Sequence, residues 1–117
     1  MPYARIEIAT GRNPHEKAAL LAAVDAAFVS TLGVPPNDAF LRLFEFAPEN
    51  AVVPAHHGPR FTFVEIQWFA GRDEATKRAL FRELYWRLGA LGIPAQDLTI
   101  ALIDIPRGDW GIAGATD

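Results

Sequence analysis

Two stretches of the chain alternate apolar and polar residues as half-buried β-strands do. In residues 3–9 the aliphatic side chains fall at even positions, and mostly charged side chains face the other way. Residues 61–69 show the same alternation, again with apolar side chains at even positions. Residues 39–46 and 98–105 each follow a turn that contains proline, and we expect them to form two further strands.

Apolar residues recur with a helical period after the first and the third of these strands. The first apolar stripe consists of Leu20, Leu21, Val24, Ala27, Phe28, Thr31 and Leu32. Asn13 is a suitable N-cap, Glu16 completes a capping box with it, and Gly33 is placed to end the helix. The second helix is expected to begin after Asp73 and to stop at Gly92.

The two halves of the chain repeat one sequence pattern. Residues 11–20, GRNPHEKAAL, return as residues 71–80, GRDEATKRAL, and keep Gly-Arg, a lysine and Ala-Leu. Residues 32–38, LGVPPND, return as residues 91–97, LGIPAQD. A repeat of this length indicates a duplicated structural unit, here strand, helix and strand.

Two β-α-β units with right-handed crossovers predict an α+β fold, with a four-stranded mixed sheet and both helices on one face. The repeats, about residues 1–59 and 60–117, should fold together as one domain, residues 1–117. Each alone is too short to be stable without a disulfide or a metal, and the chain has no cysteine.

The sheet face without helices is predicted to be rich in aromatic and charged side chains. It would carry Tyr3, Arg5, Glu7, Phe40, Arg42, Phe44, Phe46, Phe63, Glu65, Gln67, Ile103 and Ile105. Such a face is too apolar for open water, so it predicts self-association, with Arg5, Arg42, Glu7 and Glu65 pairing. Trp86 lies opposite the apolar stripe of its helix and is either a single exposed aromatic or part of an interface.

Composition and charge exclude several classes of partner. The net charge is −3 and the eleven Lys and Arg are scattered, so no nucleic-acid partner is expected. No segment approaches the roughly 20 apolar residues of a membrane helix, and the charged residues 3–9 exclude a signal peptide. Together with the absence of cysteine, this predicts a cytoplasmic protein.

No cofactor and no metal is expected. The sequence contains neither a P-loop nor a dinucleotide-binding fingerprint. His56 and His57 are adjacent, so their side chains diverge, and no third ligand is spaced to join them.

Four features together resemble the tautomerase superfamily: Pro2 directly after the initiator Met, the Gly-Arg pair at 11–12 before a helix, its copy in residues 70–72, and the C-terminal residues 108–114, GDWGIAG. The resemblance covers essentially the whole chain. Each half is similar in length to a 4-oxalocrotonate tautomerase subunit. The duplicated length is more similar to the malonate semialdehyde decarboxylase branch, where the turn ending in Asp38 also has a counterpart.

The resemblance implies that Pro2 is a catalytic residue. Once Met1 is removed, Pro2 carries a secondary amine, and an α-amino group titrates at about 7.7 to 8, close to the optimum for a general base. In the duplicated fold the amine should meet the Gly-Arg loop of the other half, which selects Arg72 over Arg12 for binding a substrate carboxylate. The counterpart of Pro2 beside Arg12 is Thr62, which has no free amine, so Arg12 is expected to be structural.

Two further site residues follow from the resemblance. Trp110 is expected either to close the substrate pocket as an apolar wall or only to pack the C-terminus. Asp38 is expected either to assist a water near Pro2 or, like its repeat counterpart Asp97, to stabilise a turn after a helix.

The chain lacks basic residues at two positions where the family pattern has them. The decarboxylase branch carries an arginine where this chain has Ala70, and the second carboxylate clamp of 4-oxalocrotonate tautomerase would fall near Phe40 or Thr99, neither of which is basic. The possible substitutes are Arg42, Arg60 and Arg107. The departure predicts a substrate with one carboxylate.

The resemblance therefore implies a cofactor-independent tautomerase that moves a proton between oxygen and carbon of a small 2-oxo or enol acid, with Pro2 as base. One alternative is a decarboxylase or hydratase, in which protonated Pro2 is the acid and Asp38 orients water. Another is a non-catalytic oligomer on the same scaffold. The resemblance also implies a homotrimer.

Overall fold

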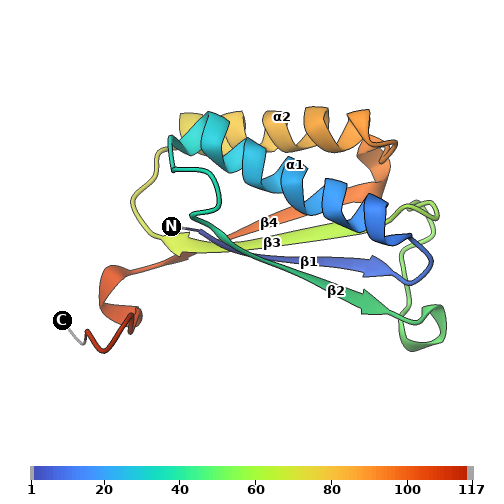
Figure 1. Cartoon of the computed structure of the whole chain (residues 1–117), viewed down its shortest axis with the longest axis horizontal. Coiled ribbons are helices and arrows are strands. Elements are labelled where there is room, and N and C mark those ends of the chain that lie inside the picture. Colours follow the sequence, from blue (N-terminus) through green and yellow to red (C-terminus); the bar gives the residue numbers. More distant parts are fainter. Residues whose placement is uncertain (1, 116–117) are drawn as a thin grey trace.

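The four predicted strands form one mixed sheet in the computed structural model, which describes residues 2–115 (Figure 1). The strand order is β2-β1-β3-β4, with β1 antiparallel to β3 and each outer strand parallel to its neighbour. The strands are β1 Tyr3–Ala9, β2 Phe40–Phe46, β3 Thr62–Phe69 and β4 Leu98–Ile105. The helices are α1 Pro14–Leu32 and α2 Glu74–Ala90. The predicted β-α-β repeat and mixed sheet are confirmed.

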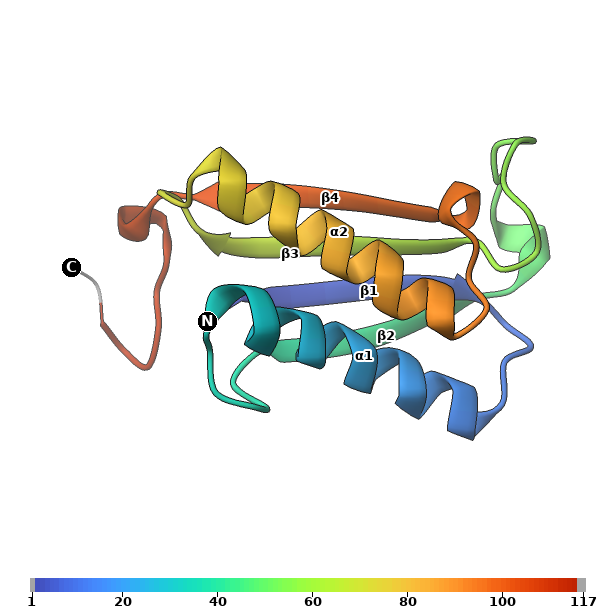
Figure 2. The ribbon, with the colours of Figure 1, turned by 90° about the horizontal axis from the view of Figure 1, so that it is seen from above.

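Both helices cover the same face of the sheet, as the view from above shows (Figure 2). The even-numbered side chains of β1 and β3 point into this layer and are buried, as the alternation predicts. The largest core side chains are Trp68, Phe28, Ile6, Ile8, Leu20, Ile66, Leu80, Leu84 and Leu88. The core therefore lies between the central strands and the two helices.

The ends of α1 follow the capping chemistry of the sequence. The Asn13 side chain accepts a hydrogen bond from the backbone N–H of Glu16, whose side chain accepts one from Asn13. Gly33 ends the helix in the left-handed region, at φ 69°. The second helix ends slightly earlier than predicted, at Ala90, and a turn that contains Gly92 at φ 88° leads out of it.

The antiparallel register of β1 and β3 sets the position of the site. Tyr3 pairs with Gln67 at one end of the sheet and Ile8 with Thr62 at the other. The start of β1 therefore lies beside the end of β3. This brings Pro2 to the end of the sheet where the second Gly-Arg loop begins.

The sheet face opposite the helices is uncovered within residues 2–115 (Figure 1). Phe40 and Phe44 on β2 are 49% and 42% exposed, and Ile103 on β4 is 38% exposed. The Arg5 guanidinium lies 4.2 Å from the centroid of the Phe44 ring and forms an ion pair with Glu7 at 3.0 Å. An apolar face with paired charges of this kind suits contact with another subunit.

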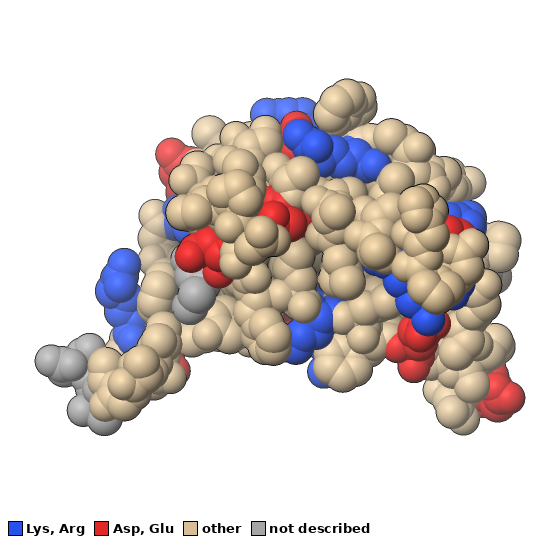
Figure 3. Space-filling view, viewed as in Figure 1, with Lys and Arg blue, Asp and Glu red and all other residues tan. Residues whose placement is uncertain are grey.

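No helix within the described residues is both long and apolar enough to cross a bilayer. On the face drawn in Figure 3, positive and negative side chains are interspersed, so the cations there do not form a continuous basic patch.

Candidate active site

Pro2 is held at the head of the central strand. Its side chain is buried, and its carbonyl oxygen accepts a hydrogen bond from the Phe40 backbone N–H at 3.0 Å. One step beyond the Tyr3–Gln67 pair, the register places Pro2 opposite Trp68. Residues directly opposite in an antiparallel pair share a face, so Pro2 and Trp68 lie on the same side of the sheet. Met1, whose removal the sequence-based prediction requires, lies outside the described residues.

Arg72 reaches the same position from the loop after β3. Gly71 adopts φ 119°, a conformation that L-residues rarely take, and so turns the chain just before Arg72. The guanidinium carbon then lies 5.0 Å from the centroid of the Trp68 ring. The Arg72 Nε atom is buried and has no hydrogen-bond partner among residues 2–115. Trp68 thus contacts Arg72 and stands opposite Pro2 in the extended strand register.

Asp104 on β4 fixes the orientation of Trp68. The Trp68 Nε1–H donates to Asp104 Oδ1 at 2.5 Å, and Lys77 Nζ donates to Oδ2 at 2.9 Å. The Lys77 hydrogen bond, followed by that of Trp68, lowers the pKa of the Asp104 carboxyl, and the same contact raises the pKa of Lys77. This group of residues was not identified from the sequence, because it joins a strand, a helix and a second strand.

A cavity of about 390 Å³ opens beside Arg72. Its lining consists of Phe69, Ala70, Gly71, Arg72 and Arg107. Pro2 is buried and is not among the lining residues. Arg107 comes from the short turn after β4, Arg107–Asp109, and its guanidinium carbon lies 4.4 Å from the centroid of the Phe69 ring. Of the three arginines considered as a second clamp, Arg107 is the one that shares this cavity with Arg72.

Trp110 forms the wall between Tyr3 and a second, smaller cavity. Its ring centroid lies 5.3 Å from that of Tyr3 and 5.5 Å from that of Phe69, and Nε1 donates to the Ile105 carbonyl at 3.3 Å. The smaller cavity, about 160 Å³, is lined by Phe69, Arg107, Trp110, Ile112 and Ala115. Trp110 therefore packs against the C-terminal segment and lines this smaller cavity, whose lining includes neither Arg72 nor Pro2, and its role as a wall of the substrate pocket stays a prediction.

Arg42 and Arg60, the other two arginines considered, lie elsewhere. Arg42 stacks on Phe40 on the uncovered sheet face, with 4.8 Å between its guanidinium carbon and the ring centroid. Arg60 forms an ion pair with Glu16 at 3.3 Å, at the end of the sheet opposite Pro2. Neither side chain lines a cavity with Arg72.

Asp38 and Asp97 share a backbone turn and differ in their side chains. Each donates its backbone N–H to a proline carbonyl, Asp38 to Pro35 and Asp97 to Pro94. The Asp97 carboxylate is buried and accepts hydrogen bonds from the backbone N–H groups of Gly58 and Arg60. Asp97 therefore anchors the loop between β2 and β3.

Asp38, in contrast, is exposed. It lies at the Pro2 end, because Phe40, two residues later, bonds to the Pro2 carbonyl. It lines neither of the two cavities beside Arg107. A structural role in the turn therefore explains the backbone hydrogen bonds of both residues and the side-chain hydrogen bonds of Asp97. It does not use the Asp38 carboxylate, which is exposed to solvent.

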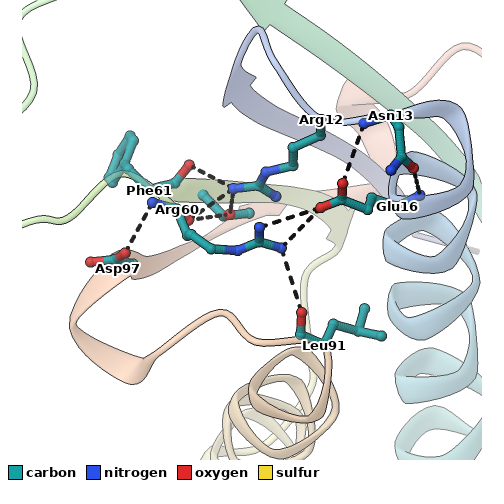
Figure 4. A network of polar contacts seen from close by, with 8 residues as sticks. Arg12, Asn13, Glu16, Arg60, Phe61, Leu91 and Asp97 are labelled. Atoms are coloured by element: carbon teal, nitrogen blue, oxygen red, sulfur yellow. Dashed lines mark hydrogen bonds and ion pairs between the residues drawn. The ribbon is translucent and has the colours of Figure 1, made fainter.

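Arg12 occupies the position in the first repeat that Arg72 has in the second (Figure 4). Its guanidinium donates to the carbonyls of Arg60 and Phe61 and to Thr62 Oγ1, at 2.9, 3.4 and 3.0 Å. Burial, and then the nearby Arg60 cation, lower the pKa of Arg12. Arg12 thus contacts Thr62, the repeat counterpart of Pro2, and uses one guanidinium nitrogen to bind protein oxygens, as a structural residue does.

The prediction that the side chains of His56 and His57 diverge is wrong. In the loop between β2 and β3 their rings are in contact, with 4.1 Å between centroids and planes tilted by 41°. His57 Nδ1 bonds to the Gln96 carbonyl at 2.5 Å, which requires Nδ1 to carry the proton. Within residues 2–115 no group of three His, Asp or Glu side chains could hold a metal ion.

A duplicated β-α-β sheet, with a proline at the head of its central strand and an arginine loop beside it, defines the tautomerase class of folds and sites. A family model described as "Tautomerase enzyme" matches residues 38–113. The chain belongs to this family.

Curated relatives match about half of the chain, as expected for a duplicated unit. The 2-hydroxymuconate tautomerases of Comamonas testosteroni and Pseudomonas putida are each 33% identical over 55 residues, which cover 46% of this chain and 87% of theirs.

Solved structures match over nearly the whole length. Native fused 4-OT superposes with a TM-score of 0.88 at 25% identity, covering 97% of this chain and 94% of that one. FG41 malonate semialdehyde decarboxylase inhibited by 3-bromopropiolate gives 0.86 at 25% identity, with 97% and 92% covered. A symmetric trimer of wild-type fused 4-OT is 32% identical, with a TM-score of 0.83 and 95% and 91% covered. These likenesses support the tautomerase fold.

Proposed function

We propose that this protein is a cofactor-independent tautomerase that moves a proton between oxygen and carbon of a small 2-oxo or enol carboxylic acid. Pro2 is the base, Arg72 binds the carboxylate and Trp110 shields the pocket from water. The observation that carries the proposal is the contrast between the repeats. One guanidinium nitrogen of Arg12 donates to Thr62 and two carbonyls, whereas the buried Nε of Arg72 has no hydrogen-bond partner among residues 2–115 and its side chain borders a cavity.

The chemistry requires an unprotonated Pro2 amine, which exists only after Met1 is removed. The Pro2 nitrogen takes the proton from the enol hydroxyl, and the electron pair left on oxygen forms the C=O bond. The electron pair of the C=C bond then takes the proton back from the protonated amine, which forms the new C–H bond at the carbon next to the carbonyl. The charge that develops on oxygen next to the carboxylate is stabilised by the Arg72 guanidinium, in the manner of an oxyanion site.

A second candidate is decarboxylation or hydration of a three-carbon oxo or unsaturated acid. The exposed Asp38 carboxylate at the Pro2 end supports it, because its repeat counterpart Asp97 is fully used by the loop between β2 and β3. The likeness to malonate semialdehyde decarboxylase points the same way. In this reaction Pro2 stays protonated as the acid and Asp38 orients the attacking water.

A third candidate, a non-catalytic oligomer, applies if Met1 stays attached, since the Pro2 nitrogen is then an amide and cannot accept a proton. For either kind of protein we propose a homotrimer in the cytoplasm. The uncovered aromatic sheet face supports self-association, and several structural neighbours are trimers.

The test compares Pro2→Ala with Thr62→Ala, its counterpart in the other repeat, after intact-mass spectrometry has established whether Met1 is absent. The substrates are 2-hydroxymuconate and phenylenolpyruvate. Pro2→Ala keeps an α-amine, but a primary one that no ring holds in place, and misplacing a catalytic group costs about 100-fold in rate. Pro2→Ala should therefore lose about that factor, while Thr62→Ala retains wild-type turnover. Equal rates in all three proteins, or a retained Met1 in the active protein, would exclude Pro2 as the base.

A further inference from the structure

We infer that Trp68 is a positioning residue for Arg72. Its ring holds the guanidinium so that the N–H groups stay free to bind an anion, and Asp104 and Lys77 in turn hold the ring. The inference deepens the proposed function and rests on it, because Arg72 is the proposed carboxylate-binding residue. Trp68 acts through Arg72 and is not expected to touch the substrate.

The Trp68 ring supports the Arg72 guanidinium through its face. The guanidinium carbon lies 5.0 Å from the ring centroid, within the range of a cation–π contact. Such a contact uses the flat face of the guanidinium, whereas its N–H groups point outward in the plane. The Arg72 Nε agrees with this, since it is buried and has no hydrogen-bond partner among residues 2–115. The ring therefore restrains the cation without using its donors.

The indole ring is itself fixed at its edge. Trp68 is fully buried, and its Nε1–H donates to Asp104 Oδ1 at 2.5 Å. The other oxygen of this carboxylate accepts a hydrogen bond from Lys77 Nζ at 2.9 Å. Trp68 and Asp104 are register partners on β3 and β4, and Lys77 lies near the start of α2. Two strands and a helix therefore set the plane of the ring on which Arg72 lies.

The first repeat contains the same ion pair without the tryptophan. Lys17 corresponds to Lys77 in the repeat. Glu45 corresponds to Asp104, and it forms an ion pair with Lys17 at 2.7 Å. The register partner of Glu45 is Ile8, which has neither a ring nor a side-chain donor. The ion pair is therefore common to both repeats, and the anchored ring belongs to the second repeat alone.

The arginines of the two repeats differ in the same sense. Arg12, whose repeat has Ile8 at the position of Trp68, donates three hydrogen bonds from one nitrogen to the loop before β3 and to the first residue of β3. Arg72 lies on the Trp68 ring instead. The aromatic residue thus accompanies the arginine whose Nε stays without a partner, and the aliphatic residue accompanies the arginine that binds protein oxygens.

The first test replaces the ring. Trp68→Ile introduces the residue of the first repeat, and Trp68→Phe keeps a ring that Asp104 cannot anchor. Isothermal titration calorimetry measures the binding of 3-phenylpropanoate, which cannot tautomerise, and of 3-phenylpropanamide, its uncharged counterpart. The wild type should prefer the carboxylate. The preference should fall by about tenfold in Trp68→Ile, because the Arg72 side chain must then be ordered on binding, and by less in Trp68→Phe.

The second test leaves the ring in place and removes its anchor. Asp104→Ala and Glu45→Ala each break one lysine ion pair at matching positions of the two repeats, so a merely structural role would affect both variants alike. Only Asp104→Ala should weaken the preference for 3-phenylpropanoate and raise KM for phenylenolpyruvate, since a poorly placed Arg72 binds the carboxylate less well. Glu45→Ala should match the wild type in both measurements.

NMR of protein labelled with ¹⁵N-arginine reports on the position of Arg72 directly. Its Nε–H resonance, assigned from its absence in Arg72→Gln, should shift in Trp68→Ile and in Asp104→Ala and stay unchanged in Glu45→Ala. An aromatic ring shifts the resonances of protons that lie near its face, so loss or rotation of the indole must move this signal. If Trp68→Ile does not fold, Asp104→Ala and Glu45→Ala decide the question.

Three results would overturn the inference: a wild type without a preference for the carboxylate, a preference that persists in Trp68→Ile, or equal effects of Asp104→Ala and Glu45→Ala. Failure of the proposed function has a different signature. The wild type would then not turn over phenylenolpyruvate, while the preference for 3-phenylpropanoate and its dependence on Trp68 and Asp104 would remain.

Discussion

At the residue scale, the two arginines that follow glycine in the repeats show how one sequence motif serves two purposes. Arg12 and Arg72 each precede a helix and follow a glycine with a positive φ, 121° at Gly11 and 119° at Gly71. Arg12 finds its acceptors in the residues that lead into β3. Arg72 instead lies over the Trp68 ring, and its buried Nε has no hydrogen-bond partner among residues 2–115.

We therefore expect Arg72→Gln to lower kcat/KM for the proposed substrates by about 100-fold, as for loss of one preorganised donor, with little change in the free energy of unfolding. Arg12→Gln should lower the free energy of unfolding by about 1–2 kcal/mol, because a half-buried charged donor loses its acceptors, and should leave kcat/KM unchanged. Steady-state kinetics and urea unfolding of both variants provide the measurement. The reverse assignment of effects would contradict the account.

Asp104 gives a pH-dependent prediction. The Lys77 and Trp68 hydrogen bonds lower its pKa in the folded state, so its stabilising contribution is complete above the ordinary carboxyl pKa of about 4 and is lost as pH falls through the lower folded value. Wild type should be more stable than Asp104→Asn at pH 7, and the difference should shrink below pH 4. Urea unfolding at several pH values measures it. A difference that does not depend on pH would refute the charge as its cause.

At the element scale, the strands and helices were predictable because each is specified locally. The even-numbered apolar residues of β1 and β3 define the buried face, and Asn13, Glu16 and Gly33 define the ends of α1. The choice of Arg72 over Arg12 followed from the expectation that the first strands of the two repeats lie near the pseudo-twofold axis. β1 and β3 do pair, and the choice of Arg72 itself stays a prediction.

The connecting segments were less predictable, because their side chains find partners far away in the sequence. Arg107 was one of three candidates until the turn after β4 placed it beside Phe69. Asp97 looked like a turn residue, yet its carboxylate binds backbone N–H groups 37 and 39 residues away. No local pattern specifies such contacts. For Arg107 the sequence did contain one usable signal, its position three residues before Trp110.

The two Gly-Arg loops yield a prediction at this scale. An alanine Cβ at Gly11 or Gly71 would meet no atom within 4 Å, so the cost of each substitution is backbone strain alone, about 1–3 kcal/mol. Gly11→Ala and Gly71→Ala should therefore be destabilised similarly in thermal unfolding. Only Gly71→Ala should also lose activity, because it redirects Arg72. Comparable activity in the two variants would argue against a catalytic loop at Gly71.

At the scale of the whole molecule, one face of the sheet is covered by the two helices and the other is not (Figure 1). The uncovered face carries the exposed apolar side chains of Phe40, Phe44 and Ile103. The second face is the proposed interface of the homotrimer. Two exposed aromatic residues on opposite faces of the molecule allow a controlled test of this interface. Phe44 is 42% exposed on the uncovered sheet face, and Trp86 is 70% exposed on α2.

We expect Phe44→Asp to dissociate the oligomer, since it places an unpaired charge in an apolar contact, whereas Trp86→Asp should leave the assembly unchanged. Sedimentation equilibrium gives the molecular mass of each variant directly, against 12.8 kDa for one chain. A trimer that survives Phe44→Asp, or that dissociates with Trp86→Asp, would place the interface on the other face.

The central claim is that removal of Met1 frees a basic Pro2 amine that works together with the Arg72 guanidinium. The most direct measurement is an NMR titration of protein labelled with ¹⁵N-proline. The account predicts a Pro2 nitrogen that titrates close to neutral pH, because the residue is buried and burial disfavours the ammonium form. A Pro2 nitrogen that does not titrate, or that titrates well above neutral pH, would contradict it.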